Sequence, residues 1–456
     1  MTLGNNSMMN LLTMPDPFGL HLCGWRRQDS FDKIINHLDT YVQIAKIAER
    51  GKLDGIFIAD GNGVYGMDKP ELFEANWPAN MTGNFEPLTL LSALSQHTRH
   101  LGLIATASTT FEQPYLLARR FASLDMISGG RGGWNVVTSS DGPDALNFGL
   151  ERLPDRKERY ARCMEFTEVV KGLWDSWAAD AFPQNKATGK FLDRSKVREL
   201  NHKGKYFTVK GPLCAARSAQ GQPVLYSAGQ SEMGRELAAR HSDGLFAVAN
   251  NKEVAMRDYA DIKGRMAKYG RRPEQLRIAA YIGLYIGETT SEAQEYFDQL
   301  QAMITPEVGL QYLSRALRMD LSGYSVDDPM PEIVGEVVDG YSNRTQMGEV
   351  IKRDRPTIRQ TYERMIPATG SVYFIGTPKQ AADFMEDWYR SGACDGFMVG
   401  NPSQPRGLLM LVDRIVPELQ RRGLFRKEYP GTTLRETMGV PIPVRRPDAV
   451  AATGAA

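Results

Sequence analysis

A glycine-rich segment that leads into a short strand with hydroxyl groups is the most informative feature of this 456-residue sequence. Residues 128–140 read Ser-Gly-Gly-Arg-Gly-Gly-Trp-Asn-Val-Val-Thr-Ser-Ser, and Asn-Phe-Gly follows at 147–149. The glycines permit positive φ and close approach of the backbone, and the β-branched residues after them predict a buried strand. Asn135 and Ser139 would share one face of that strand. The segment predicts polar groups that could bind a ligand at a strand end, or a plain tight turn before a core strand.

Two more polar residues end predicted strands. Asp60 follows the apolar run 55–59, and Thr106 lies near the end of the run 101–107. Barrel enzymes place their chemistry at the carboxyl ends of strands, so Asp60 is a candidate site residue. A helix-cap or turn role for Asp60 and a packing role for Thr106 are the alternatives.

A third group of residues could bind an anion. Arg156 and Tyr160 are four residues apart at the start of a predicted helix, so they share a face. A guanidinium and a phenol near a helix N-terminus suit a phosphate. Gly229 and Ser231 follow the predicted strand 224–228, where a glycine turn and a capping serine would leave backbone N–H groups for an anion. A solvated basic helix start and an ordinary N-cap are the simpler interpretations.

These residues need a scaffold that brings several strand ends together. Short β-branched or apolar runs recur at 18–23, 55–59, 101–107, 133–139, 224–228, 244–248, 278–286 and 396–399. Amphipathic stretches lie between them, at 41–50, 88–98, 116–127, 159–177, 231–241, 252–269 and 378–391. Eight strands alternating with helices predict a (β/α)8 TIM barrel of the α/β class. A doubly wound sheet would show the same alternation.

The predicted organisation is one barrel with long insertions. We expect an N-terminal extension at 1–17, the barrel at 18–440 and a disordered tail at 441–456. Three connections are too long for ordinary loops and are predicted to cover the carboxyl-end face of the barrel: 61–87, 178–222 and 304–376. The second of them contains a predicted small β element at 205–210.

Composition excludes several classes of protein. A formal charge of +1 gives no field that would favour nucleic acid or a membrane surface. The four cysteines lie far apart, and neither they nor the six histidines have metal-ligand spacing. The first 17 residues do not resemble a signal peptide, and no run of 18 apolar residues occurs. We therefore expect a cytoplasmic protein without a structural metal or disulfides.

A nucleotide-binding motif also occurs in the sequence. Residues 61–66 read Gly-Asn-Gly-Val-Tyr-Gly and follow a predicted strand, which matches G-x-G-x-x-G. In dinucleotide-binding folds this motif must open a helix, whereas two prolines interrupt residues 67–78. We therefore interpret these glycines as the hinge of a lid that leaves the end of the strand, and not as a dinucleotide site.

The string S-G-G-R-x-x-W-N-V-V-T-S, with N-F-G beyond it, resembles the signature of bacterial-luciferase-like flavin monooxygenases. The similarity is to the branch that contains nitrilotriacetate, dibenzothiophene-sulfone and long-chain-alkane monooxygenases. Further matches extend it over roughly residues 18–440, including Phe-Ile-Ala-Asp at 57–60, Ala-Gly at 228–229, Gly-Thr-Pro-Lys at 376–379 and Val-Pro-Glu-Leu-Gln at 416–420. The resemblance implies a TIM barrel.

It also implies a function. The protein would be the oxygenase component of a two-component monooxygenase that receives FMNH2 from a separate NAD(P)H:flavin reductase. It would insert one atom of O2 into a small organic substrate through a C4a-(hydro)peroxyflavin. The alternatives are an F420-dependent oxidoreductase of the same superfamily and a non-enzymatic flavin-binding protein. Relatives usually pair, so a homodimer or higher homo-oligomer is expected.

The resemblance assigns roles to the candidate residues. Asp60 would lie beside the flavin ring and Thr106 under it, and the strand with Asn135 and Ser139 carries the signature itself. Relatives have a histidine where this chain has Arg156, which could still bind the phosphate together with Tyr160, Gly229 and Ser231. No catalytic residue on the substrate side is assigned. The basic run 352–364 could indicate an anionic substrate, although we favour a solvated helix face.

Overall fold

The computed structural model describes residues 8–65, 67, 73, 85–139, 142–333 and 342–445. Within them, eight parallel strands close into a barrel in the order β1-β2-β3-β4-β7-β8-β9-β11, with β11 paired back to β1. Their bounds are β1 Asn10–Thr13, β2 Gly55–Ile58, β3 Gly102–Ser108, β4 Gly132–Val137, β7 Val224–Ser227, β8 Gly244–Ala247, β9 Arg277–Ile286 and β11 Gly396–Gly400. The predicted (β/α)8 TIM barrel is confirmed.

The first barrel strand lies earlier than predicted. This strand is β1, which lies within residues 1–17, whereas residues 18–23 form turns ahead of a short 3-10 helix, Gly24–Arg26. The prediction of a strand at 18–23 and of an extension at 1–17 is therefore wrong. Asp54 fixes β1 in place, because its buried carboxylate accepts hydrogen bonds from Leu11 N (2.6 Å) and Asn10 Nδ2 (2.6 Å). Arg426 completes this contact with bonds of 2.9 and 3.1 Å to the two Asp54 oxygens.

A ninth strand, β10 (Val372–Gly376), lies outside the barrel and was not predicted. The first part of β9 pairs with β8 and β11, while its last residues, from Ile282 to Ile286, pair with β10 in parallel. The length of β9 therefore allows one strand to serve both the barrel and an added edge.

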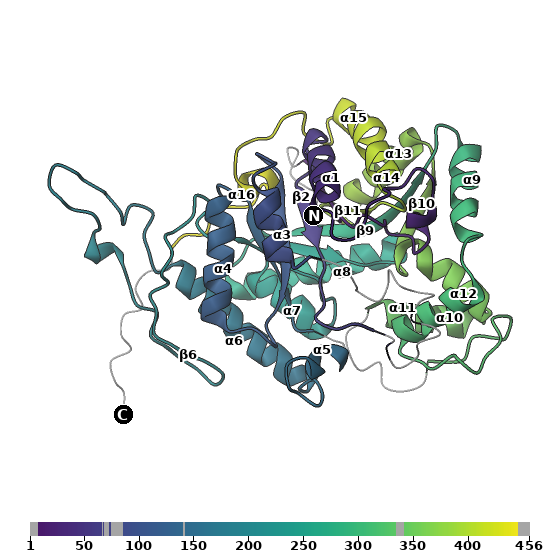
Figure 1. Cartoon of the computed structure of the whole chain (residues 1–456), viewed down its shortest axis with the longest axis horizontal. Coiled ribbons are helices and arrows are strands. Elements are labelled where there is room, and N and C mark those ends of the chain that lie inside the picture. Colours follow the sequence, from purple (N-terminus) through teal and green to yellow (C-terminus); the bar gives the residue numbers. More distant parts are fainter. Residues whose placement is uncertain are drawn as a thin grey trace.

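Helices surround the barrel (Figure 1). The principal ones are α1 Leu38–Arg50, α3 Pro87–Leu94, α4 Pro114–Ile127, α6 Arg156–Trp174, α7 Glu232–His241, α8 Lys252–Arg265, α9 Thr290–Gln301 and α13 Pro378–Arg390. Shorter ones are α5 Gly142–Leu146, α14 Arg406–Met410, α15 Val416–Arg421 and α16 Leu434–Met438. Most predicted helical stretches are confirmed to within a few residues. No helix in the described part of the chain is long and apolar enough to cross a membrane.

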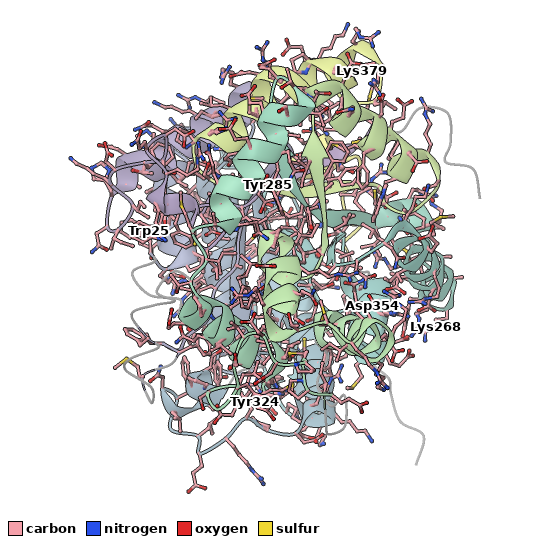
Figure 2. All side chains as sticks on the ribbon, turned by 90° about the vertical axis from the view of Figure 1, so that its right-hand side faces the viewer. Trp25, Lys268, Tyr285, Tyr324, Asp354 and Lys379 are labelled. Carbon is pink, nitrogen blue, oxygen red and sulfur yellow. The ribbon has the colours of Figure 1, made fainter. Side chains whose placement is uncertain are left out.

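The long connections differ in structure. Residues 178–222 hold the antiparallel hairpin β5 (His202–Lys203) and β6 (Thr208–Val209), which extends beyond α6 at the left of Figure 1. The connection 304–376 contains α10 Pro306–Leu317, α11 Ser342–Asp354 and α12 Ile358–Met365, which share an apolar cluster. Figure 2 views the molecule from this side. Much of the predicted lid 61–87 and the end of the predicted tail lie outside the described residues.

Candidate active site

Thr106 and Asn135 meet on neighbouring strands at the carboxyl end of the barrel. They are register partners on β3 and β4, and both side chains are buried. Asn135 Nδ2 donates to Thr106 Oγ1 (2.9 Å), and Thr106 Oγ1 donates to Ile58 O (2.6 Å). Asn135 Oδ1 is buried and accepts no hydrogen bond from the residues that the structure describes. An unpaired buried acceptor is costly, so this atom is suited to a donor from a ligand.

Ser139 follows β4 in a left-handed conformation with φ of 51°, which is uncommon for a residue with a side chain. Its Oγ lies 2.7 Å from Ser108 Oγ, and its carbonyl oxygen accepts a hydrogen bond from Arg159 Nη1 (2.6 Å). Sequence reasoning missed both Ser108 and Arg159 as parts of the site. Buried Arg159 links the end of β4 to α6, so it connects the two groups of predicted residues.

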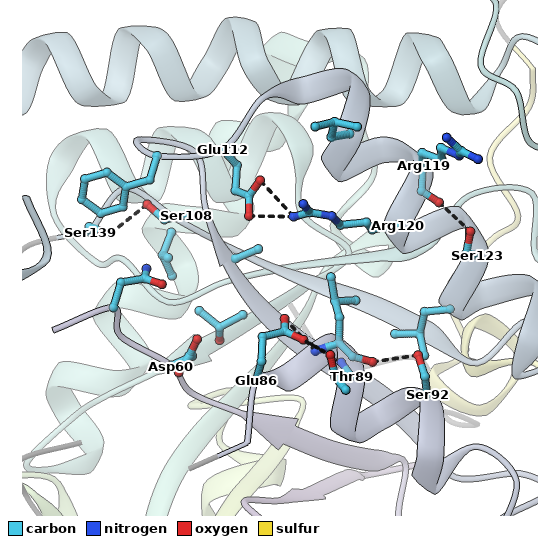
Figure 3. A pocket seen from close by; sticks show the side chains of 18 of the residues that line it. Asp60, Glu86, Thr89, Ser92, Ser108, Glu112, Arg119, Arg120, Ser123 and Ser139 are labelled. Carbon is cyan, nitrogen blue, oxygen red and sulfur yellow. Dashed lines mark hydrogen bonds and ion pairs between the residues drawn. The ribbon is translucent and has the colours of Figure 1, made fainter. Parts of the chain in front are cut away.

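Asp60, Thr106 and Ser139 line a pocket of about 710 Å³ between α3, α4 and the carboxyl ends of β3 and β4. Figure 3 shows Asp60 close to Glu86 on one side of this pocket and the Ser108–Ser139 pair on the other. Burial, with a smaller contribution from the carboxylates of Glu86 and Asp144, raises the pKa of Asp60 to about 7. Its side chain can therefore hold or release a proton near neutral pH.

The predicted anion-binding residues also come together. Arg156 begins α6 and lies over the ring of Tyr160, with 5.8 Å from its guanidinium carbon to the ring centroid. Tyr160 packs against Gly229, where an added Cβ would lie 2.8 Å from the tyrosine hydroxyl oxygen. Ser231 caps α7 by accepting a hydrogen bond from Gly234 N (3.2 Å). A cation, a phenol and a helix N-terminus converge here, as a phosphate requires.

FMN, the cofactor that the resemblance implies, fits both groups of residues. Its ring can donate an N–H group, which matches the buried Asn135 Oδ1. The absence of a side chain at Gly229 leaves the Tyr160 hydroxyl free of steric conflict at the anion end. Ser139 and Arg159 join the two ends through one hydrogen bond. The eight predicted residues therefore form two neighbouring clusters rather than scattered positions.

The glycine motif at 61–66 is part of a loop over the barrel end. An added Cβ at Gly63 would lie 2.9 Å from Asp144 N, so glycine is needed where this loop crosses the start of α5. Asp144 accepts hydrogen bonds from Asn62 N (3.1 Å) and Tyr65 Oη (3.4 Å). Gly66 and the predicted sequel at 68–72 lie outside the described residues, so the lid stays a prediction.

The basic run 352–364 is largely ion-paired at the surface. Arg353 and Arg364 contact Asp354 at 2.6 and 3.4 Å, and Arg359 contacts Asp327 at 2.9 Å. Figure 2 shows Asp354 beside the helices of this insertion. The arrangement favours the solvated helix face that the sequence suggested.

Comparison with known proteins identifies relatives over nearly the whole chain. N-acetyl-S-(2-succino)cysteine monooxygenase of Bacillus subtilis (strain 168) is 46% identical over 430 residues, which cover 94% of this chain and 96% of the relative. Nitrilotriacetate monooxygenase component A of Aminobacter aminovorans is 40% identical over 445 residues, which cover 97% of this chain and 98% of the relative.

Solved structures of related enzymes also match nearly the whole chain. EDTA monooxygenase from Chelativorans sp. BNC1 has a TM-score of 0.76 at 32% identity and covers 95% of this chain and 99% of its own. Riboflavin lyase, solved with modified FMN and riboflavin, has a TM-score of 0.84 at 28% identity, and the match covers 95% of this chain and 96% of the lyase. The sequence profile of the luciferase-like monooxygenases matches residues 19–395. The chain therefore belongs to the family of luciferase-like monooxygenases.

Proposed function

We propose that this chain is the oxygenase component of a two-component FMNH2-dependent monooxygenase. The observation that supports it best is the convergence of Arg156, Tyr160 and Gly229 at one end of the site, with the unpaired acceptor of Asn135 at the other. A cation and a phenol suit a terminal phosphate, and an acceptor suits a ring N–H group. The family of the chain is consistent with both assignments.

The cofactor supplies the oxygen chemistry when it is bound, and the protein supplies orientation and shielding. Thr106 holds the Asn135 amide through its hydroxyl, so that the free oxygen of this amide has a fixed direction. Asp60 can exchange a proton at the pocket wall, because its pKa lies near 7. Arg156, Tyr160 and the start of α7 bind the phosphate in this proposal.

A separate NAD(P)H:flavin reductase provides the reduced cofactor. The nitrilotriacetate relative is itself named as component A of its system. The purified chain should not oxidise NADH or NADPH alone, and substrate-dependent oxygen consumption should begin when FMN and an unrelated flavin reductase are added. FAD should support slower turnover, because its adenylate has to fit where Arg156, Tyr160 and Gly229 converge around the proposed phosphate. Turnover driven by NADH without a reductase would refute the two-component assignment, and turnover with F420 alone would favour the oxidoreductase alternative.

The substrate is proposed to be a small organic polycarboxylate. The compounds in the names of three relatives, N-acetyl-S-(2-succino)cysteine, nitrilotriacetate and EDTA, each carry several carboxyl groups. A panel of aminopolycarboxylates and succinylated thioethers, with alkanes and sulfones as neutral compounds, tests this class by oxygen consumption in the coupled assay. Turnover confined to the neutral compounds would refute it.

We also propose that the chain forms a homodimer or higher homo-oligomer. Leu116 and Ile127 on α4 are 47% and 54% exposed and lie on one face of the helix, with the polar residues Arg120 and Ser123 between them. A second copy of the chain bound at this face would cover both apolar side chains. Light scattering after size exclusion gives the oligomeric state, and the double variant Leu116→Glu, Ile127→Glu should shift it toward monomer. A monomeric wild-type chain would contradict the proposal.

A further inference from the structure

Arg315 on α10 has no anionic partner, although it is half-buried. Its guanidinium carbon lies 4.0 Å from the centroid of the Tyr65 ring. Among the described residues it forms neither an ion pair nor a side-chain hydrogen bond. An arginine over an aromatic face is held by the ring, while the N–H groups along its edge stay available.

Other arginines of the same insertion are different. Arg359 on α12 is paired with Asp327 at 2.9 Å, and Arg364 contacts Asp354 at 3.4 Å. A half-buried guanidinium without an acceptor loses hydration and gains no ion pair in return. A solvated surface charge therefore does not explain why the half-buried guanidinium of Arg315 has no acceptor.

Gln311 lies one turn before Arg315 on the same side of α10. Gly309 and Leu313 face the cluster that α10 shares with α11 and α12, and Gly309 directly contacts the Tyr362 ring. A helix turns by 100° per residue, so Gln311 and Arg315 lie on the opposite face. The Gln311 side chain is 8% exposed, and its Oε1 finds no partner among the residues described. The unpaired amide oxygen of Gln311 and the unpaired guanidinium of Arg315 thus lie one helical turn apart.

This pair faces the barrel end that holds the proposed site. Tyr65, which Arg315 covers, is five residues beyond Asp60, and its hydroxyl donates to Asp144 of α5. The α5 and α10 helices lie along the same lower side of the molecule in Figure 1. The α10 helix therefore lies against the loop that follows β2.

We propose that Arg315, with Gln311, binds a carboxylate group of the substrate. This inference rests on the proposed function and names the residue that selects the polycarboxylate class. A planar guanidinium edge can donate two parallel hydrogen bonds to a carboxylate, and Gln311 can add one only by donating from Nε2, because a carboxylate accepts and does not donate. Asp144 accepts a hydrogen bond from the hydroxyl of Tyr65, the ring that Arg315 covers, so an acidic group on the α5 side would orient the substrate with its carboxylate toward α10.

The test measures binding of nitrilotriacetate, propane-1,2,3-tricarboxylate and the trimethyl ester of nitrilotriacetate by calorimetry. Arg315→Met keeps the apolar contact with Tyr65 and removes the charge, Arg315→Lys keeps the charge, and Arg359→Ala is the matched control on α12. We expect Arg315→Met to weaken binding of at least one tricarboxylate by about 10- to 100-fold without affecting the ester. Arg315→Lys should restore part of the affinity, and Arg359→Ala should behave as wild type.

FMN affinity of each variant is measured in parallel, which separates this inference from the proposed function. Unchanged FMN affinity with weakened tricarboxylate binding supports the Arg315 site. Tricarboxylate affinity that is equal in wild type and Arg315→Met overturns it, as does a wild type that binds no tricarboxylate more tightly than the ester. A wild type that fails to bind FMN refutes the proposed function alone.

Discussion

Replacing Gly229 with alanine tests the proposed phosphate end of the site directly. An added Cβ would lie 2.8 Å from the Tyr160 hydroxyl oxygen and 3.3 Å from Gly234 Cα. Gly229 does not adopt positive φ, so alanine is compatible with the backbone and the conflict is with the tyrosine. The hydroxyl at the end of the side chain has to move, and its position toward a phosphate changes with it.

The expected loss is that of one neutral hydrogen bond. Such a bond contributes about 0.5–1.5 kcal/mol, or about a 2- to 13-fold change in the dissociation constant of FMNH2. Tyr160→Phe removes the same bond and should cost the same amount. The double variant should lose no more than either single variant, because phenylalanine has no hydroxyl for the new methyl group to displace.

The assay is anaerobic titration with FMNH2, followed by protein fluorescence. Gly264→Ala is the matched control, because an added Cβ on this residue of α8 meets nothing within 4 Å. The control should keep flavin affinity and gain roughly 0.5–1 kcal/mol of stability, as expected for alanine in a helix. Additive losses in the double variant, or full affinity in Gly229→Ala, would refute the contact between Tyr160 and the phosphate.

Three further predictions concern charge. Arg156→Ala should weaken FMNH2 binding by about 1.5–3 kcal/mol, and unchanged affinity in the same titration would remove this arginine from the site. Because the pKa of Asp60 is raised to about 7 in the folded protein, the stability that this group contributes should be present below about pH 4 and lost as the pH rises through 7. In urea unfolding, the free energy of unfolding should therefore fall less between these pH values in Asp60→Asn than in the wild type. An equal fall in both proteins would contradict the prediction. Arg426→Ala leaves the buried Asp54 carboxylate without its cation and should lower the free energy of unfolding by about 3–5 kcal/mol. Asp413→Ala removes an exposed ion pair and should change the free energy of unfolding by about 0–1 kcal/mol. Equal effects of the two substitutions in denaturant melts would refute this distinction between buried and exposed pairs.

Much of the barrel was predictable because its strands carry a local signal. Runs such as Gly102–Ser108 and Arg277–Ile286 are rich in apolar and β-branched residues, and parallel strands are buried on both faces. The strand β1 carries little such signal, since its four residues, Asn-Leu-Leu-Thr, include no valine, isoleucine or aromatic residue. Asp54 and Arg426 stabilise it through contacts that are distant in sequence. Residues 18–23 alternate like a strand, but their backbone contacts with Asn401 and Pro402 are two isolated hydrogen bonds and form no ladder.

The candidate site was predictable to the extent that its residues end strands or begin helices. Asn135 follows from the strand pattern, whereas Thr106 was assigned through the family resemblance, and their mutual hydrogen bond follows from the parallel register. Arg159 was missed, because a basic residue at a helix start is commonly solvated, and only the fold brings it to the Ser139 carbonyl. Arg315 has the same character, since its significance depends on Tyr65, which is far away in sequence.

The ninth strand has a consequence for how this enzyme can vary. Because β10 lies parallel to the end of β9, the connection leaves the sheet after Ile286 and returns at Val372, which pairs with Ile282, four residues back along the same strand. Residues 287–371 can therefore change in length or helical content while the closed ring of eight strands keeps its register. Exchanging this whole segment between related enzymes, with its two flanking strands as fixed joints, is then a practical way to transplant a substrate preference without disturbing the flavin end.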